Sequence, residues 1–304
     1  MFIPPSGSSA ASSPGGETGA DRWPARFGVL SAILGFVAAQ VVIGVLAIIY
    51  VALGGDIDTG SGDTKSDPAF VVAASVVQGV IFAATAVAIA RTIGPVRACD
   101  FGLVRARLWP TVGKVVVFGV AYYAALAVYA ELVNLTSDDA PDKLGAAAGT
   151  FGMLAFALVA AVIAPIAEEF FFRGMVFRAL ANGLGVVGGA VVSGVFFGSL
   201  HIDSLAQERL LQVVPLMILG IVFALLYAWS GTLYASIALH ATNNSLAVIA
   251  YAADKQSEFG IVLGAVLWLT MMAFCLFGWR LTDRPNRPGP MVAPERPEPA
   301  ATVS

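Results

Sequence analysis

The chain has 304 residues, of which 58% are hydrophobic and 12% are charged, and its net charge is −3 at pH 7. Soluble domains have roughly 25% charged and about 45–50% apolar residues, so this composition excludes an ordinary soluble enzyme and a disordered chain. A nucleic-acid-binding protein is also excluded, because a net negative chain offers no basic surface for phosphates. The class that fits is a helical membrane protein.

The chain begins with a segment rich in Ser, Gly and Pro, residues 1–26, which we predict to be a disordered arm. Residues 27–282 contain apolar runs long enough to cross a bilayer, since about 20 apolar residues span its hydrocarbon core as a helix. Residues 283–304, rich in Pro and Arg, are predicted to be a second disordered tail. The predicted spans are 27–53, 69–90, 111–133, 148–167, 184–201, 212–230, 232–252 and 260–281. The sequence therefore predicts an all-α bundle of about eight transmembrane helices.

Lysine and arginine are distributed unevenly over the segments that connect these spans. One alternating set of segments holds 13 of them and the opposite set holds 4. Segments rich in Lys and Arg stay in the cytoplasm, so we expect both termini to be cytoplasmic. The richness in Ala, Gly and Arg suggests a bacterial sequence, and we expect a multi-pass protein of the plasma membrane.

Two adjacent carboxylates, Glu168 and Glu169, follow the fourth apolar run. A charge in mid-bilayer costs about 2.5–3.5 kcal/mol on insertion scales, so such residues are functional candidates. Glu169 and Arg173 are four residues apart, share a helix face and can form an ion pair. Glu168 lies about 100° around the helix and stays available as a general base. The alternative is a structural charge cluster at the cytoplasmic end of the helix.

The two histidines of the chain fall in the same half as this carboxylate pair. His201 ends the fifth run, one helical turn after Phe197, while His240 and Asn244 are four residues apart in the seventh run. A carboxylate and a histidine can deprotonate water, and a histidine and an amide can stabilise an oxyanion. Two histidines and a carboxylate can also form the His₂Glu ligand set of a catalytic zinc, which here would be Glu168, His201 and His240. Taken singly, His201 fits an interfacial histidine, and the other pair fits an interhelical hydrogen bond.

Three short motifs within residues 148–252 resemble those of the CPBP family of membrane endopeptidases, which includes the CAAX proteases and the Abi bacteriocin-processing proteins. They read E-E-x-x-x-R from Glu168, F-x-x-x-H from Phe197 and H-x-x-x-N from His240, in the family's order. The resemblance implies an endopeptidase of glutamate type or a zinc-dependent one. The sequence contains no His-Glu-x-x-His run, and we favour the metal-independent mechanism, so no cofactor is expected and zinc is the alternative.

The resemblance also implies a role for each matching residue. Glu168 and His201 would activate the water, and His240 and Asn244 would stabilise the oxyanion. The residues that would support this site are Glu169, Arg173 and Phe197. The implied substrate is a peptide or a membrane-associated protein; the bilayer is the other partner, no nucleic acid is expected, and the sequence does not indicate an oligomeric state.

Two other functions fit the same residues. The first is a non-catalytic membrane scaffold that binds a partner helix through the Gly-rich fifth run. The second is an ion- or proton-coupled transporter, which would carry inverted repeats that the sequence lacks.

One feature of the hydropathy profile conflicts with a shared site. The profile puts His201 at the outer end of its span and Glu168 toward the cytoplasmic side. For the two residues to meet, the fourth helix must extend to about Arg178, or the fifth helix must be short or shifted.

Overall fold

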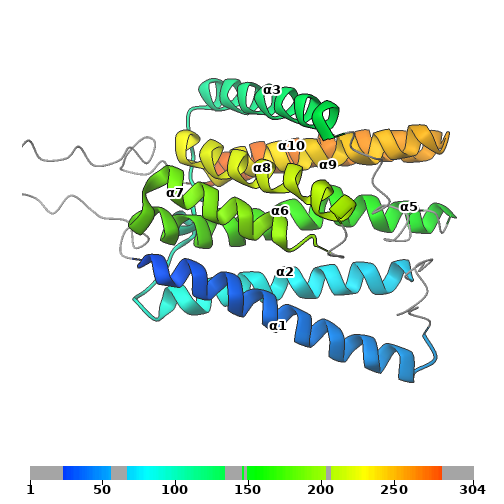
Figure 1. Ribbon diagram of the computed structural model, residues 1–304, viewed down its shortest axis with the longest axis horizontal. Coiled ribbons are helices and arrows are strands. Elements are labelled where there is room, and N and C mark those ends of the chain that lie inside the picture. The colour runs from blue at the N-terminus through cyan, green and yellow to red at the C-terminus, as the bar shows by residue number, and fades with distance from the viewer. Residues whose placement is uncertain (1–22, 56–66, 134–145, 147–148, 203–206, 283–304) are drawn as a thin grey trace, which may run out of the picture.

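The computed structural model describes residues 23–55, 67–133, 146, 149–202 and 207–282 (Figure 1). Apart from residues 23–26, the two predicted disordered ends lie outside this part of the chain. Every regular element in the described ranges is helical, which confirms the all-α class. The ends of the described chain, at the start of α1 and the end of α10, lie toward the same end of the bundle (Figure 1).

The elements follow one another along the chain as three groups. The first comprises α1 (Ala25–Ala52), α2 (Pro68–Arg91), the short η2 (Ala98–Phe101) and α3 (Leu108–Val133). The second is α5 (Gly149–Leu158), the π-helical η3 (Val159–Ile163), α6 (Ala164–Phe171), the π-helical η4 (Phe172–Phe177) and α7 (Arg178–Ser199). The third is α8 (Gln207–Ser230), α9 (Leu233–Asp254) and α10 (Glu258–Leu281).

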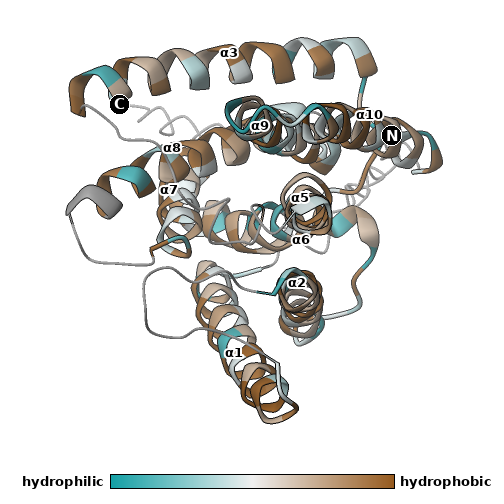
Figure 2. Ribbon diagram, turned by 90° about the vertical axis from the view of Figure 1, so that its right-hand side faces the viewer, coloured by the Kyte–Doolittle hydropathy of each residue, from teal (hydrophilic) through white to brown (hydrophobic). Residues whose placement is uncertain are grey.

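Six helices of the described chain are long and apolar enough to cross a membrane, so the expected count of about eight is not confirmed. All but the outermost one or two residues of the fourth and fifth predicted spans belong to a single helical segment, Gly149–Ser199, of 51 residues. Helix α9 is not among the six, because His240, Asn243 and Asn244 lower the mean hydropathy of its centre. Apolar residues predominate along the outer helices α1 and α3 (Figure 2). Many of their side chains are exposed, as lipid-facing residues are: Ile48 is 72% exposed and Val120 65%.

The long segment folds back on itself at Gly185. This residue has φ +72° and ψ 169°, a conformation open to glycine that ends one helical arm and starts the next. The two arms pack closely, because a Cβ atom on Gly189 would lie 2.7 Å from the backbone nitrogen of Ala181. Glu169 and His201 are the same number of residues from Gly185 on opposite sides, so the antiparallel arms bring them to a similar level.

This hairpin accounts for the conflict in the hydropathy profile. The first arm stays helical from Gly149 to the residue before Gly185, so the predicted end at residue 167 is wrong. Glu168, Glu169 and Arg173 lower the local hydropathy without ending the helix. The second arm is short, and Figure 1 shows that α7 and α8 end about halfway along the bundle while α5, α9 and α10 extend further. Both changes allow Glu168 and His201 to approach the same depth.

Glycines on α7 and α8 permit a close helix contact beside the site. A Cβ atom on Gly194 would lie 2.7 Å from the backbone nitrogen of Ile221 and 2.8 Å from the carbonyl oxygen of Met217. A Cβ atom on Gly220 of α8 would lie 2.9 Å from the Cα atom of Gly194. The small residues spaced four apart on α7 therefore allow close packing against α8, as their spacing predicts.

Replacing Gly194 by alanine tests this packing. The added methyl group meets backbone atoms that cannot move independently, so we expect Gly194→Ala to destabilise the protein by about 1–3 kcal/mol. Gly44→Ala on α1 is the matched control, because no atom lies within 4 Å of its Cβ position and alanine favours the helix. Thermal unfolding in detergent measures both; equal melting temperatures for the two variants would contradict the close contact.

Candidate active site

The centre of the bundle contains a buried cluster of three ionisable side chains. Glu169 Oε1 lies 2.9 Å from Arg173 Nη1 on the same helical segment and 2.9 Å from His240 Nδ1 on α9. The side chains of Glu169 and Arg173 have no exposed surface, and that of His240 is 4% exposed. The ion pair that the four-residue spacing predicts is therefore formed, and His240 joins it.

The charge of Arg173 is compensated on several sides. Its Nη2 donates to the carbonyl oxygen of Gly220 on α8 at 3.0 Å. The guanidinium lies over the rings of Phe197 and Phe223, 4.7 and 5.0 Å from their centroids. A buried charge is tolerated only when it is paired and hydrogen-bonded, and cation–π contacts add to this when they are desolvated. Arg173 therefore holds α7, α8 and the Glu169 helix together.

His240 is oriented by contacts on its ring faces and on Nδ1. The ring stacks on Phe223 at 4.8 Å with an interplanar angle of 23°, and meets Phe197 edge to face at 5.9 Å. Since the Glu169 carboxylate is paired with Arg173 and accepts hydrogen bonds, Nδ1 of His240 carries a proton and donates it. Nε2 is then the nitrogen left for a substrate group.

Asn244, one turn after His240, is bound to a carbonyl group that the helix itself cannot satisfy. In the π-helical turn η3 the Ala164 amide donates to Val159, five residues back. The next carbonyl, that of Ala160, would need an N–H from residue 165, but residue 165 is a proline. Asn244 Nδ2 donates to Ala160 O at 2.8 Å instead. One of the two amide hydrogens of Asn244 is therefore used, and the other is left.

Glu168 and His201 are less enclosed than this cluster. Glu168 is half-buried, and within the described part of the chain no hydrogen bond or ion pair engages its carboxylate. His201 is exposed, and its Nδ1 lies 3.0 Å from the carbonyl oxygen of Phe197. A carbonyl only accepts, so Nδ1 carries the proton and Nε2 offers a lone pair. The structure forms no direct hydrogen bond between Glu168 and His201.

Phe197 contacts one residue from each of the three motifs. Its side chain is buried, and its ring contacts His201, His240 and the Arg173 guanidinium. Of the predicted site residues, the structure thus brings together Glu169, Arg173, Phe197 and His240 in one cluster, with His201 at its edge. Glu168 and Asn244 lie on the same two helices and face other surroundings.

A zinc site is not formed by the predicted ligands. Among the residues that the structure describes, no three His, Cys, Asp or Glu side chains come together as a ligand set for a metal ion. Glu168, His201 and His240 are therefore not gathered as a ligand set in this structure.

Several residues of the site have no counterpart in the sequence-based prediction. Phe223 and Gly220 on α8 contact Arg173, and Asn243 on α9 donates through Nδ2 to Asn244 Oδ1 at 3.0 Å. Phe223 and Gly220 lie in an ordinary apolar run, where nothing distinguishes them. Asn243, a second amide beside Asn244, is the one signal that could have been followed.

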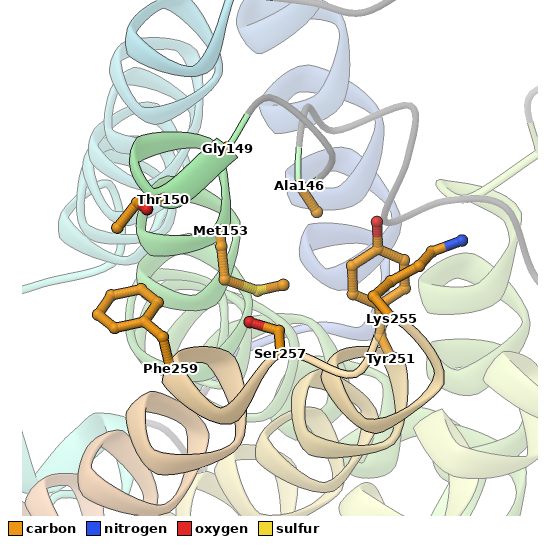
Figure 3. Close-up of a pocket in the computed structure, with 8 residues that line it drawn as sticks. All are labelled: Ala146, Gly149, Thr150, Met153, Tyr251, Lys255, Ser257 and Phe259. Atoms are coloured by element: carbon orange, nitrogen blue, oxygen red, sulfur yellow. The ribbon is translucent and has the colours of Figure 1, made fainter.

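A cavity of about 380 Å³ lies elsewhere in the bundle, where α5 begins and α9 turns into α10 (Figure 3). Met153 and Phe259 form part of its apolar lining, and Tyr251, Lys255 and Ser257 line it with polar groups. None of the motif residues lines this cavity. It is therefore separate from the cluster around Glu169.

Comparison with known proteins supports the interpretation of the three motifs. Residues 150–246 match the family model described as Rce1-like, Type II CAAX prenyl endopeptidase Rce1-like. The match covers about a third of the chain and contains all three motifs. The resemblance to the CPBP and CAAX protease family is thereby confirmed over this region, which lies in a multi-pass membrane protein. No curated protein and no solved structure gives a match.

Removing the Arg173 guanidinium tests the buried cluster. Arg173→Met leaves the Glu169 carboxylate buried without its cation, so we expect a loss of about 3–5 kcal/mol in unfolding free energy. Glu169→Gln added to Arg173→Met removes the unpaired charge and should recover part of this loss. The control Arg91→Met changes an exposed arginine at the end of α2 and should cost at most about 1 kcal/mol. Chemical unfolding in mixed micelles measures the wild type and the three variants; equal losses at residues 91 and 173 would disprove the cluster's role.

Proposed function

We propose that the protein is an intramembrane endopeptidase that hydrolyses a peptide bond with Glu168 and His201 activating water. The observation that carries this proposal is the difference between two neighbouring carboxylates. Glu169 is fully buried and bound to Arg173 and His240, while Glu168 is half-buried and unpaired within the described chain. A carboxylate that is not engaged by a cation or a hydrogen-bond donor can accept a proton from water, whereas a buried, ion-paired one serves to hold its neighbours.

The proposed reaction begins with a water molecule between Glu168 and Nε2 of His201. Glu168 accepts a proton from the water, and the oxygen attacks the carbonyl carbon of the scissile peptide bond. The C–N bond of the tetrahedral intermediate then breaks, and the proton passes from Glu168 to the leaving amine. His201 holds the water through its Nε2 lone pair, which the hydrogen bond from Nδ1 to Phe197 keeps available.

The oxyanion of the tetrahedral intermediate needs hydrogen-bond donors. The second amide hydrogen of Asn244 is one donor, since the first is held by Ala160. In its imidazolium form His240 is the other: Nδ1 donates to Glu169 and Nε2 to the oxyanion. Glu169, Arg173 and Phe197 support these groups by fixing the ring and helix positions. Loss of a single oxyanion donor typically costs about 10²–10³ in kcat.

The proposed substrate is a peptide or a membrane-associated protein that reaches the site from the bilayer. The family's printed name describes an endopeptidase that acts on prenylated CAAX sequences, and a prenylated peptide is therefore one probe. The proposed location is the plasma membrane, with both termini in the cytoplasm as the distribution of Lys and Arg predicts. The reaction as proposed uses no metal.

The test compares purified wild type with Glu168→Gln on two substrates. One is a mixed library of unmodified peptides, and the other is a farnesylated peptide ending in a CAAX sequence, with new termini read by mass spectrometry. We expect Glu168→Gln to lower cleavage by about 10²–10⁴-fold, because the general base is lost, with no change in the melting temperature. Glu131→Gln, the same substitution at an exposed glutamate on α3, is the matched control and should cleave at the wild-type rate.

The outcomes separate the possible explanations. Cleavage that survives Glu168→Gln would show that Glu168 is not the base. Absence of cleavage by the wild type on both substrates would count against a peptidase and favour the scaffold. If only the farnesylated peptide is cleaved, the enzyme requires a prenyl group on its substrate.

A further inference from the structure

Helix α3 is attached to the bundle by apolar packing and by hydrogen bonds to α8 and α9. Of its residues, Gly119 and Tyr122 are buried, and most of its surface faces outward (Figure 1). Lys114 Nζ donates to the carbonyl oxygen of Trp229, and the Tyr129 hydroxyl donates to that of Leu211 at 2.8 Å. Both acceptors are backbone groups of α8; the Leu211 carbonyl is free because Pro215, four residues later, has no N–H.

A third hydrogen bond leads from α3 toward the proposed site. The Tyr123 hydroxyl lies 3.1 Å from Asn243 Oδ1 on α9. Asn243 Nδ2 donates to Asn244 Oδ1 at 3.0 Å, and Asn244 Nδ2 donates to Ala160 O at 2.8 Å. Three side chains thus form an unbroken chain of hydrogen bonds from the outer helix to the π-helical turn.

The direction of every bond in this chain is fixed by its last member. The Ala160 carbonyl can only accept, so the amide nitrogen of Asn244 must face it and the amide oxygen of Asn244 must face Asn243. Asn243 must then present its nitrogen to Asn244 and its oxygen to Tyr123. The Tyr123 hydroxyl is consequently the donor that closes the chain, and no member can be reversed without placing two acceptors against each other.

We infer that Tyr123 is a positioning residue for the oxyanion site: through Asn243 it holds the amide plane of Asn244. This inference rests on the proposed function, in which the second amide hydrogen of Asn244 meets the oxyanion. Asn244 is held at its nitrogen by Ala160 and at its oxygen by Asn243. Without the Tyr123 hydroxyl, Asn243 can turn its nitrogen away, and Asn244 keeps one anchor and can tilt.

The surroundings make this hydrogen bond more consequential than one on a soluble protein. Lipid offers no water to replace a lost donor, so Asn243 Oδ1 would be left unsatisfied or would seek another partner. Helix association in a membrane depends on van der Waals packing and on interhelical hydrogen bonds, so these polar contacts contribute to the position of α3 together with the packing of residues such as Phe118 and Tyr122. Tyr123 therefore also helps to fix where α3 sits beside the site.

The test measures kcat and KM separately for Tyr123→Phe on a peptide that the wild type cleaves. We expect kcat to fall about tenfold, a fraction of the loss seen when an oxyanion donor is removed, and KM to change less than twofold. Tyr122→Phe is the matched control, since it removes the hydroxyl of the neighbouring tyrosine, whose ring packs in the core, and it should keep the wild-type kcat. Activities are corrected for the folded fraction of each preparation.

A double-mutant cycle separates positioning from a general loss of structure. If Tyr123 acts through Asn243, Tyr123→Phe should lower kcat no further in the Asn243→Ala background. The same cycle in melting temperature tests the hydrogen bond without using activity, and should also be non-additive.

The failure of this inference can be told apart from the failure of the proposed function. Cleavage that is unaffected by Glu168→Gln would overturn the proposed function, and with it the positioning role of Tyr123. If cleavage depends on Glu168 but kcat is unchanged in Tyr123→Phe, or the effects in the cycle are additive, the positioning role alone would be overturned. A kcat loss that disappears on correction for the folded fraction would also overturn it.

Discussion

The carboxylate of Glu169 is fully buried at the centre of the bundle, and the surrounding helices supply the groups that neutralise it. Arg173 on the same helical segment supplies the opposite charge. Other helices satisfy part of the remaining hydrogen-bonding capacity of the pair, while Glu169 Oε2 and Arg173 Nε have no partner among the described residues. Gly220 on α8 accepts from Arg173, and His240 on α9 donates to Glu169. Phe197 on α7 covers the guanidinium. Four helical elements thus supply partners to one buried ion pair.

Much of the fold could be predicted from the sequence, but the boundaries of its helices could not. The length of the apolar runs gave the helical class, and the helical period gave the Glu169–Arg173 pair, since both depend on neighbours along the chain. Hydropathy averages over a window, so it ended a helix where Glu168 and Glu169 lower the average, although their partners lie on other helices. The turn at Gly185 has no composition that marks it, because a single glycine inside a Gly-rich run provides it.

The site shows the same division between local and distant information. The motif spacing placed the candidate side chains on helix faces, and the family match supports the region. The sequence could not show that His240 binds Glu169, or that Asn244 satisfies the carbonyl left by the proline in the first motif's helix. Those contacts depend on the rotation of α9 about its axis. Tyr123 was equally hidden, since a tyrosine in an apolar helix has no neighbour in sequence that indicates a polar partner.

The hairpin at Gly185 has a consequence for how the two arms can vary. A loop of ordinary length can accommodate an inserted residue without moving the helices that it connects. A single-residue turn between two packed helices cannot, so an insertion changes the position of one helix relative to the other. Each added residue would advance one arm by about 1.5 Å and rotate it by about 100° relative to the other. Glu168 and His201, which we propose to activate the water, would then change their orientation relative to each other although neither had been replaced. The number of residues between them is therefore itself part of the proposed site, and a chain could lose the proposed chemistry by a change in length while keeping every motif intact.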